Sequence, residues 1–242
     1  MNAIANSGLC SMAKLPFRMF SKEPMEDGNV FIFGKSPELY SSDFADGIAR
    51  IGGPGRHPNY FFTYLLAARK MVDDGKESGT YDDIGLPVFY LQRHATELLI
   101  KRLLSWCYDL VELQSKEVDF KFMLSNNAVG RVRGSHDLNK LFADLTGVTA
   151  ALGYELPVEI GALVQAISEH EITETFARYE RSGKGDEVVL HVASEVSLPI
   201  VALQLLLEST AKVSLFQRHE DESLELTLHD AWQAKTFHDL SE

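Results

Sequence analysis

The segment 86–104, LPVFYLQRHATELLIKRLL, constrains the fold more than any other, because its apolar periodicity predicts part of a long helix. Arg93, Glu97 and Lys101 recur every four residues and therefore form one stripe along this helix. Apolar side chains flank the stripe; they are Phe89, Ile100 and Leu104 on one side and Tyr90 and Leu98 on the other. A charged stripe between apolar rows predicts a crevice or an interface. A salt-bridge ladder on the solvated surface explains the same spacing equally well.

A second run of basic residues lies in GRVRGSHDLNKLFADL, which covers residues 130–145. Ser135 is a suitable N-cap for a helix that carries its leucines on one face. Arg131, Arg133 and His136 would then lie at the start of this helix, where free backbone N–H groups attract anions. We therefore predict a phosphate-binding site here. Solvated loop charge remains an alternative for the arginines, and a capping or packing role remains one for the histidine.

The rest of the chain alternates between helical patterns and polar connections. We expect a polar loop at 75–85 and an irregular connection at 114–134. Helices are predicted at 60–74, 87–113, 157–171, 198–216 and 231–240, and short strands at 30–33, 187–193 and 224–228. The predicted fold is therefore mainly α, with a small accessory β-element formed from the chain termini.

Three parts are expected along the 242 residues. Residues 1–28 are predicted to be a flexible tail, because they lack the continuous apolar core of a secretory signal. Residues 29–183 are predicted to form a helical domain with an N-terminal extension. The pattern changes after a turn or linker at 182–186, so residues 184–242 are predicted to be a C-terminal α/β appendage.

Composition excludes several classes of function. The formal net charge of −12 argues against broad coating of nucleic acid, but it leaves room for a local basic cleft. The two cysteines, Cys10 and Cys107, have no zinc-site or disulfide spacing, and no P-loop, GxSxG or HExxH motif occurs. No window approaches about 18 uninterrupted apolar residues. We therefore expect a cytoplasmic protein with no membrane span, metal site or cofactor.

Arg178 and Tyr179 follow the helix predicted at 157–171. They are predicted to return a cation and a phenol to the crevice beside the Arg93 stripe. Ion pairing of Arg178 with Glu174 or Glu180 explains this arginine nearly as well.

Three of these features occur together in one known family. The pattern PxFxxxRHAxELxxKxLL from Pro87, then Ser-His-Asp-Leu at 135–138, then Arg178–Tyr179, is similar to HEPN domains. The resemblance covers about residues 58–182 and implies a bundle of four or five helices that often forms a homodimer. In many bacterial members it implies a metal-independent endoribonuclease of phage-defence, toxin–antitoxin or abortive-infection systems.

The catalytic signature of those ribonucleases is an arginine, four to six residues, and then a histidine, with both subunits contributing to one cleft. Arg131 and His136, with four residues between them, match it. The resemblance implies that His136 acts as general base or acid on the ribose 2′-OH and that Arg131 holds the scissile phosphate. Glu97 would join this catalytic set by orienting or polarising the pair. The implied substrate-binding residues are Arg93, Lys101, Arg133, Arg178 and Tyr179.

The sequence departs from the ribonuclease pattern at two places. Val132 follows the arginine where a polar residue is common, and Asp137–Leu138 stands where an aromatic residue is common after the histidine. The His-Asp-Leu form is similar to HEPN members that accompany nucleotidyltransferases or serve as binding modules. The alternative function is therefore a non-catalytic module that binds a nucleotide or a partner. An antitoxin or a nucleotidyltransferase is the partner that the resemblance implies.

Overall fold

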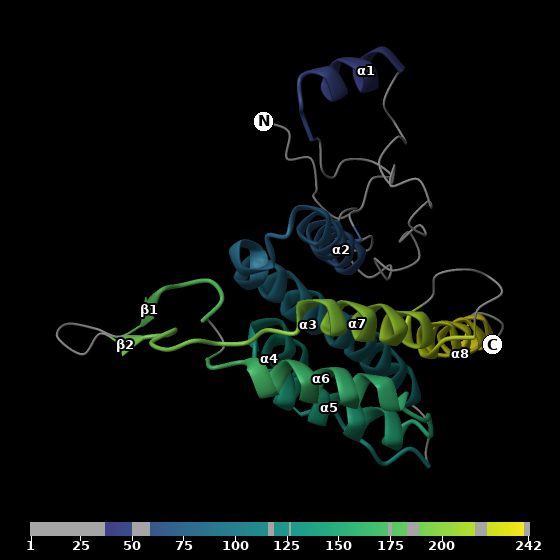
Figure 1. The fold of residues 1–242 in the computed structure, drawn as a ribbon. Coiled ribbons are helices and arrows are strands. Elements are labelled where there is room, and N and C mark those ends of the chain that lie inside the picture. Colours follow the sequence, from purple (N-terminus) through teal and green to yellow (C-terminus); the bar gives the residue numbers. More distant parts are fainter. Residues whose placement is uncertain are drawn as a thin grey trace, which may run out of the picture. The chain divides into compact units, whose positions relative to one another are not determined.

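The computed structural model describes residues 37–49, 59–115, 119–125, 127–173, 176–182, 189–215 and 222–239. Within these ranges the chain is mainly helical, as its periodicity predicts (Figure 1). The elements in chain order are α1 Pro37–Ala45, α2 Tyr60–Ser78, α3 Tyr81–Gln114, α4 Ala128–Gly134, α5 Leu138–Ala151, α6 Val158–His170, β1 Arg181–Ser182, β2 Val189–Leu190, α7 Ile200–Ser214 and α8 Leu224–Asp239. The predicted tail at 1–28 and the predicted strand at 30–33 lie outside the described residues.

Two compact units divide the chain, Met1–Asn59 and Tyr60–Glu242. The described part of the first unit contains α1, which is followed by Gly47 in the left-handed region at φ +66°. The second unit contains every other described element. Among the described helices, none combines the length and the apolarity that crossing a membrane requires.

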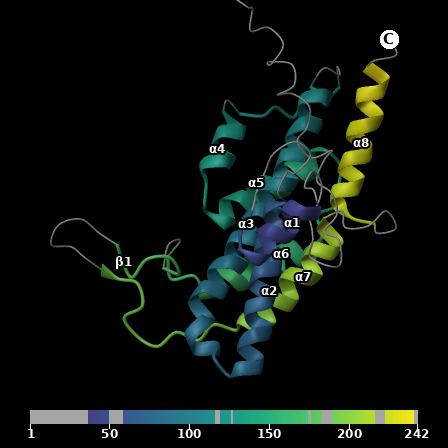
Figure 2. The same cartoon turned by 90° about the horizontal axis from the view of Figure 1, so that it is seen from above.

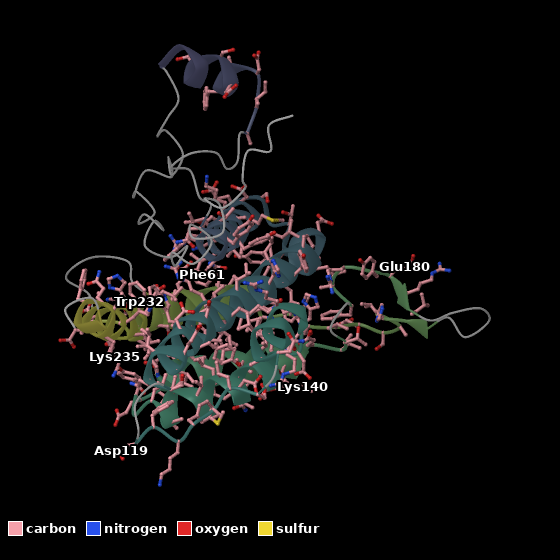
Figure 3. The ribbon with its side chains drawn as sticks, turned by 180° about the vertical axis from the view of Figure 1, so that it is seen from behind. Phe61, Asp119, Lys140, Glu180, Trp232 and Lys235 are labelled. Carbon is pink, nitrogen blue, oxygen red and sulfur yellow. The ribbon has the colours of Figure 1, made fainter. Side chains whose placement is uncertain are left out.

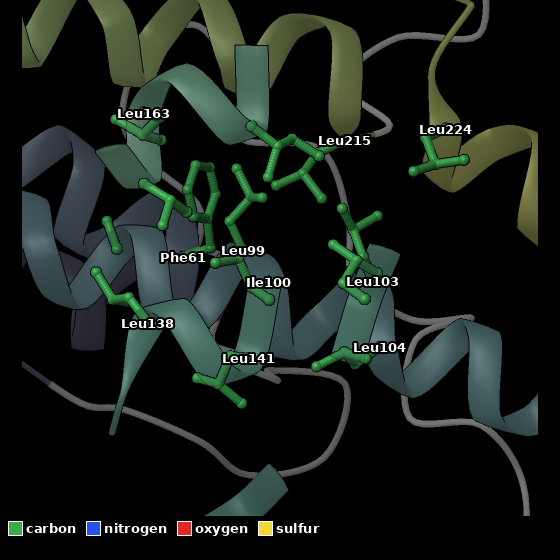
Figure 4. Close-up of a cluster of buried hydrophobic side chains, with 14 of the residues drawn as sticks. Phe61, Leu99, Ile100, Leu103, Leu104, Leu138, Leu141, Leu163, Leu215 and Leu224 are labelled. Atoms are coloured by element: carbon green, nitrogen blue, oxygen red, sulfur yellow. The ribbon is translucent and has the colours of Figure 1, made fainter. Parts of the chain in front are cut away.

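Helix α3 is the centre of the second unit, because it contacts α2, α4, α5, α6, α7 and α8. Figure 2 shows α4 and α8 on opposite sides of it. Its fully buried leucines and Ile100 meet side chains from the surrounding helices, as Figure 4 shows. The labelled core residues are Phe61, Leu99, Ile100, Leu103, Leu104, Leu138, Leu141, Leu163, Leu215 and Leu224. Each fully buried side chain of this size stabilises the fold by roughly 1.5–3 kcal/mol relative to an exposed one.

The prediction of a loop at 75–85 is wrong, because most of these residues belong to α2 or α3. Gly75 lies inside α2, where a Cβ would come within 2.4 Å of Ile84 Cδ1, so the missing side chain permits close packing of α2 on α3. Gly79, at φ +72°, then ends α2 in the left-handed conformation that glycine adopts readily. Helix α3 therefore starts at Tyr81 and not at Pro87. The carboxylates of Asp82 and Asp83 in its first turn stabilise this start, because the N-terminal end of a helix carries partial positive charge.

The strand predicted at 224–228 is also wrong, because these residues begin α8. The alternation LELTL also places Leu224 and Leu228 four residues apart, on one helical face, and both are buried. The Ser223 hydroxyl accepts a hydrogen bond from the Leu226 amide at 3.2 Å and so caps the first turn. In the described chain, the β-structure is a short antiparallel pair in which Arg181 faces Leu190, so it does not join the two termini.

The predicted C-terminal appendage at 184–242 supplies α7 and α8. Helix α7 packs against α2, α3 and α6, and α8 packs against α3 and α7. Leu203, Leu207 and Leu228 are buried in the same core cluster as the leucines of α3. These two helices therefore complete the helical core of the second unit.

Candidate functional site

A buried carboxylate on α3 gathers groups from three separate segments. The Glu97 carboxylate accepts hydrogen bonds from Arg93 Nη1 at 2.8 Å and from Lys101 Nζ at 2.8 Å. His136 Nδ1, in the link between α4 and α5, lies 3.0 Å from Glu97 Oε1. Arg93 Nε also donates to Glu171, the residue that follows α6, at 2.7 Å. We call these five residues the Glu97 cluster.

Burial distinguishes this cluster from a salt-bridge ladder on the surface. The side chains of Glu97 and Arg93 are 2% and 6% exposed, and that of Lys101 is 17% exposed. Charges so far from water are retained in a fold when their hydrogen-bonding capacity is met, and here several donors meet one carboxylate. His136 differs from the others because half of its side chain is exposed. The cluster therefore consists of buried charged groups and one imidazole ring, that of His136, which reaches solvent.

The same cations hold the link between α4 and α5 on α3. Arg93 Nη2 donates to the backbone carbonyl of His136, and Lys101 Nζ donates to the carbonyl of Arg133 at 3.2 Å. The fork of the Arg93 guanidinium thus binds Glu97, Glu171 and this carbonyl with three different N–H groups. The backbone around His136 is therefore held to α3 at two carbonyls, those of Arg133 and His136.

The electrostatics of Glu97 determine which nitrogen of His136 carries a proton. Burial by itself raises the pKa of Glu97, but the hydrogen bond from Lys101 and the charges of Lys101, His136 and Arg93 lower it below its ordinary value. An ionised carboxylate accepts hydrogen bonds only, so Nδ1 of His136 is the protonated nitrogen in the neutral ring. Nε2 is then left to accept or deliver a proton, as a general acid–base requires.

The two arginines do not lie where the sequence predicts them. Arg131 and Arg133 belong to the last turn of the short helix α4, and not to the start of the following helix. The N-cap of α5 is Asp137, whose carboxylate accepts from the Lys140 amide at 3.0 Å, so the prediction of Ser135 is wrong. This carboxylate already occupies the helix N-terminus where a phosphate was predicted to bind. The anion site based on free N–H groups is therefore not formed by these residues.

Arg131 is also separated from His136. Its side chain is exposed and donates to the Ser125 hydroxyl. Its charge acts on Tyr108. Burial and the charge of Asp144 raise the pKa of Tyr108, and the charge of Arg131 opposes this increase. Tyr108 lies three turns of α3 beyond Glu97, which is about 16 Å along the helix axis. Of the arginines near the end of α4, Arg133 is the one tied to the Glu97 cluster, through its carbonyl.

Arg178 and Tyr179 do return to α3, at the level of Tyr90. The Arg178 guanidinium carbon lies 5.8 Å from the ring centroid of Tyr90 and 5.7 Å from that of Tyr179. Tyr90 in turn stacks on His94 with an angle of 6° between the rings. Burial is the main reason that the pKa of His94 is lowered, and Arg93, Lys101 and Arg178 lower it further while Glu97 opposes them. His94 is therefore close enough to interact electrostatically with the Glu97 cluster and with Arg178.

Two members of this region are not singled out by the sequence alone. Glu171 has no helical partner at a spacing of three or four that would mark it, and its pairing with Arg93 depends on where α6 ends. His94 could have been found, because Tyr90 and His94 are four residues apart on the predicted helix. Figure 3 shows Glu180, beside Tyr179, at the opposite end of this unit from Trp232 and Lys235.

An open groove of about 510 Å³ lies between α5 and α6, and it is lined by Asn139, Phe142, Gly161, Val164, Gln165, Ser168 and Glu169. Asn139 is three residues beyond His136, and Glu169 is two residues before Glu171, so one end of the groove adjoins the Glu97 cluster. Its charged lining residue is acidic. This groove is therefore not the basic cleft that the sequence predicts.

Among the described residues, no group of three or more His, Cys, Asp or Glu side chains is arranged to hold a metal ion. No protein-family model, curated protein or solved structure matches the chain. The chemistry of the site must therefore be inferred from its own geometry and from the sequence resemblance.

Proposed function

We propose that the chain is a cytoplasmic HEPN-type protein that acts on RNA as a metal-independent endoribonuclease, in phage defence or a toxin–antitoxin system. One observation carries this proposal: the half-exposed ring of His136 is held through Nδ1 by the buried carboxylate of Glu97, at 3.0 Å. A carboxylate that fixes the tautomer and orientation of an imidazole is a recurrent arrangement in acid–base catalysis. The order of Arg131 and His136 in the sequence supports RNA as the substrate.

His136 is the proposed catalytic residue. Its Nε2 takes the proton of a ribose 2′-OH while the 2′ oxygen bonds to phosphorus and the bond from phosphorus to the 5′ oxygen breaks. The departing 5′ oxygen takes a proton from water. Glu97 is a positioning residue, because it acts on the substrate only through His136, where it stabilises the imidazolium that forms.

The phosphate that gains charge in this reaction needs cationic partners. Arg133 has an exposed side chain, and its backbone carbonyl accepts from Lys101 of the Glu97 cluster, so we propose its guanidinium as the contact to such a phosphate. Lys101 adds a partly exposed ammonium group, although Glu97 already holds it. We propose that Arg131 contacts the scissile phosphate in a homodimer, in which two copies of the chain contribute to one cleft.

Cleavage of a labelled RNA in the presence of EDTA tests the proposal. Wild type should cut, and His136→Ala should lose about 10²–10⁴-fold in rate, as expected for removal of a general acid–base. His229→Ala is the matched control, because His229 Nδ1 also pairs with a carboxylate, that of Asp230, at 3.1 Å, but at a distance from the cluster. Equal cleavage by wild type and His136→Ala would remove the proposal.

The placement of Arg131 favours a second candidate, a non-catalytic HEPN module that binds a nucleotide or a partner. Its guanidinium donates to the Ser125 hydroxyl, so Arg131 is engaged with a residue outside the Glu97 cluster. This candidate predicts binding of a nucleoside triphosphate that Arg133→Ala weakens, with RNA left intact by wild type. Cleavage of RNA that depends on His136 would exclude it.

A further inference from the structure

A ladder of aromatic rings and a guanidinium runs from the interior of the second unit to its surface. Tyr64 of α2 packs edge-on against His94 with the ring centroids 4.4 Å apart. Tyr90 stacks nearly parallel on His94, at 5.8 Å, and Arg178 lies over Tyr90. Tyr179 is the outer end of this ladder. The first three rings are half-buried, whereas Arg178 and Tyr179 are exposed.

The outer end of the ladder has the features of a stacking surface. The Tyr179 side chain is 59% exposed, so much of a large ring remains in contact with water. Arg178 lies within cation–π distance of two tyrosines at once, which holds its planar group beside the Tyr179 ring. Unpaired nucleobases stack on tyrosine rings and guanidinium planes, whereas bases within a duplex do not offer their faces.

The ladder continues into the Glu97 cluster along one helix. Tyr90 lies one turn before Arg93 and two turns before Glu97, so these residues share a face of α3. The axial separation of Tyr90 and Glu97 is about 10 Å. The segment after α6 connects the two regions, because Glu171 binds Arg93 and Phe176 packs on Phe89 with ring centroids 5.3 Å apart. A group stacked on Tyr179 is therefore close enough to belong to the same strand as a phosphate at His136.

We propose that Tyr179 and Arg178 form a subsite that binds one unpaired nucleobase, with Tyr90 and His94 supporting Arg178 from behind. This inference rests on the proposed function, since it assigns single-stranded RNA as the substrate class of the Glu97 cluster. The tyrosine ring supplies the stacking surface. The guanidinium supplies a cation for the adjoining phosphate, in a chain whose net charge is otherwise −12.

The experiment measures binding of a short single-stranded RNA containing 2-aminopurine to the full chain carrying His136→Ala, so that cleavage does not interfere. Stacking should quench the 2-aminopurine fluorescence. Adding Tyr179→Ala should remove the quenching and weaken binding about 5- to 30-fold, whereas Tyr179→Phe should keep both. Arg178→Ala should weaken binding and reduce its dependence on salt. Duplex RNA of the same sequence should bind without quenching.

Matched controls are provided by two residues outside the ladder. Tyr60 is 57% exposed, almost as much as Tyr179, and Arg181 has an exposed side chain only three residues after Arg178. Tyr60→Ala and Arg181→Ala should leave quenching and affinity unchanged. The same measurements with AMP and ATP separate a base in RNA from a base in a free nucleotide, and loss of nucleotide binding in Tyr179→Ala would also support the subsite.

The outcomes separate this inference from the proposed function. RNA binding with quenching that survives Tyr179→Ala overturns the base subsite, while cleavage by wild type in the earlier assay would still support the ribonuclease. Absence of binding to RNA and to both nucleotides overturns the subsite as well. Cleavage that requires His136, together with unchanged binding in Tyr179→Ala, would show that the substrate is held elsewhere.

Discussion

Helix α3 contacts two buried carboxylates, one of its own and one of α8, whose surroundings are alike except in one respect. In its first half, Glu97 accepts from Arg93 and Lys101 and contacts His136. Near its second half, Glu225 of α8 accepts from Arg102 and from Trp106 Nε1, the latter at 2.8 Å. The side chains of both glutamates are almost completely buried, at 2% and 3% exposed. Each site joins α3 to a segment that is distant in the sequence.

The difference lies in what each site presents to solvent. Trp106 is 2% exposed, and neither an indole nor a guanidinium changes its protonation near neutral pH. His136 is half-exposed, and its imidazole ring can both donate and accept a hydrogen bond. A buried ion pair by itself indicates a structural role. The accessible imidazole of His136 is what makes the Glu97 cluster a candidate for catalysis. Four substitutions or conditions test this contrast.

The largest effect is expected for Glu97→Ala. It leaves Arg93 buried beside Glu171 without its second carboxylate, and breaking such a pair costs about 3–5 kcal/mol of unfolding free energy. Urea unfolding measures this loss, and RNA cleavage should disappear at the same time. Glu97→Gln keeps the shape and one acceptor oxygen, so it should be destabilised less. A loss below about 1 kcal/mol in Glu97→Ala would show that the cluster is solvated in solution.

Glu225→Ala should destabilise the fold without changing the rate of RNA cleavage. The substitution removes the carboxylate that accepts from the Trp106 N–H and from Arg102, and the loss of hydrogen bonds to a buried charged group costs about 1.5–3 kcal/mol. Urea unfolding and the cleavage assay should be run on the same preparation. Loss of cleavage by folded Glu225→Ala would contradict the division into an architectural site and a chemical one.

A smaller effect is expected for Asp137→Ala, which removes the cap of α5 beside His136. The lost hydrogen bond to the Lys140 amide should cost about 1 kcal/mol of unfolding free energy. Because Asp137 adjoins His136, cleavage should fall as the link becomes less fixed. Asp137→Asn, which also caps helices well, is the control and should retain both properties. Equal losses in the two variants would show that the charge of Asp137 matters and not its cap.

The smallest effect is expected in the pH dependence of stability, because burial offsets part of the stabilisation by the cations. Folding lowers the pKa of Glu97 below its ordinary value of 4.5, so its stabilising contribution is fully present above that pH. The contribution is lost as the pH falls through the lowered value. Unfolding measured for wild type and Glu97→Gln should therefore differ more at pH 7 than at pH 3. A difference that grows on acidification would contradict the sign of this pKa shift.

Much of the helical architecture can be predicted from local patterns. The helices expected at 60–74, 157–171 and 198–216 are confirmed apart from their ends, since an apolar stripe of period 3.6 is a local property. Failures occur where one pattern fits two structures. LELTL alternates as a strand does, yet the helical spacing of Leu224 and Leu228 suits the core that α3 offers. Pro87 often marks the start of a helix, but α3 begins at Tyr81, nearly two turns before this proline.

The candidate site divides in the same way. The spacing of Arg93, Glu97 and Lys101 establishes that they share a face, and the structure confirms that Arg93 and Lys101 both donate to Glu97. The spacing of Arg131 and His136 does not establish contact, because a helix end and an extended link lie between them. Short sequence separation limits how far apart two residues can be, but it does not orient their side chains.

The sequence by itself determined the mainly helical fold, the charged stripe of α3 and the order of basic residues before α5. The tertiary structure alone decided that Glu97 is buried, that Glu171 and the carbonyl of His136 share Arg93, and that Arg131 binds Ser125 instead. Helical periodicity depends on neighbours within a few residues. The partners of Arg93 and Lys101 outside α3 lie 30 to 80 residues away in the sequence, and their positions are fixed only when the core packs.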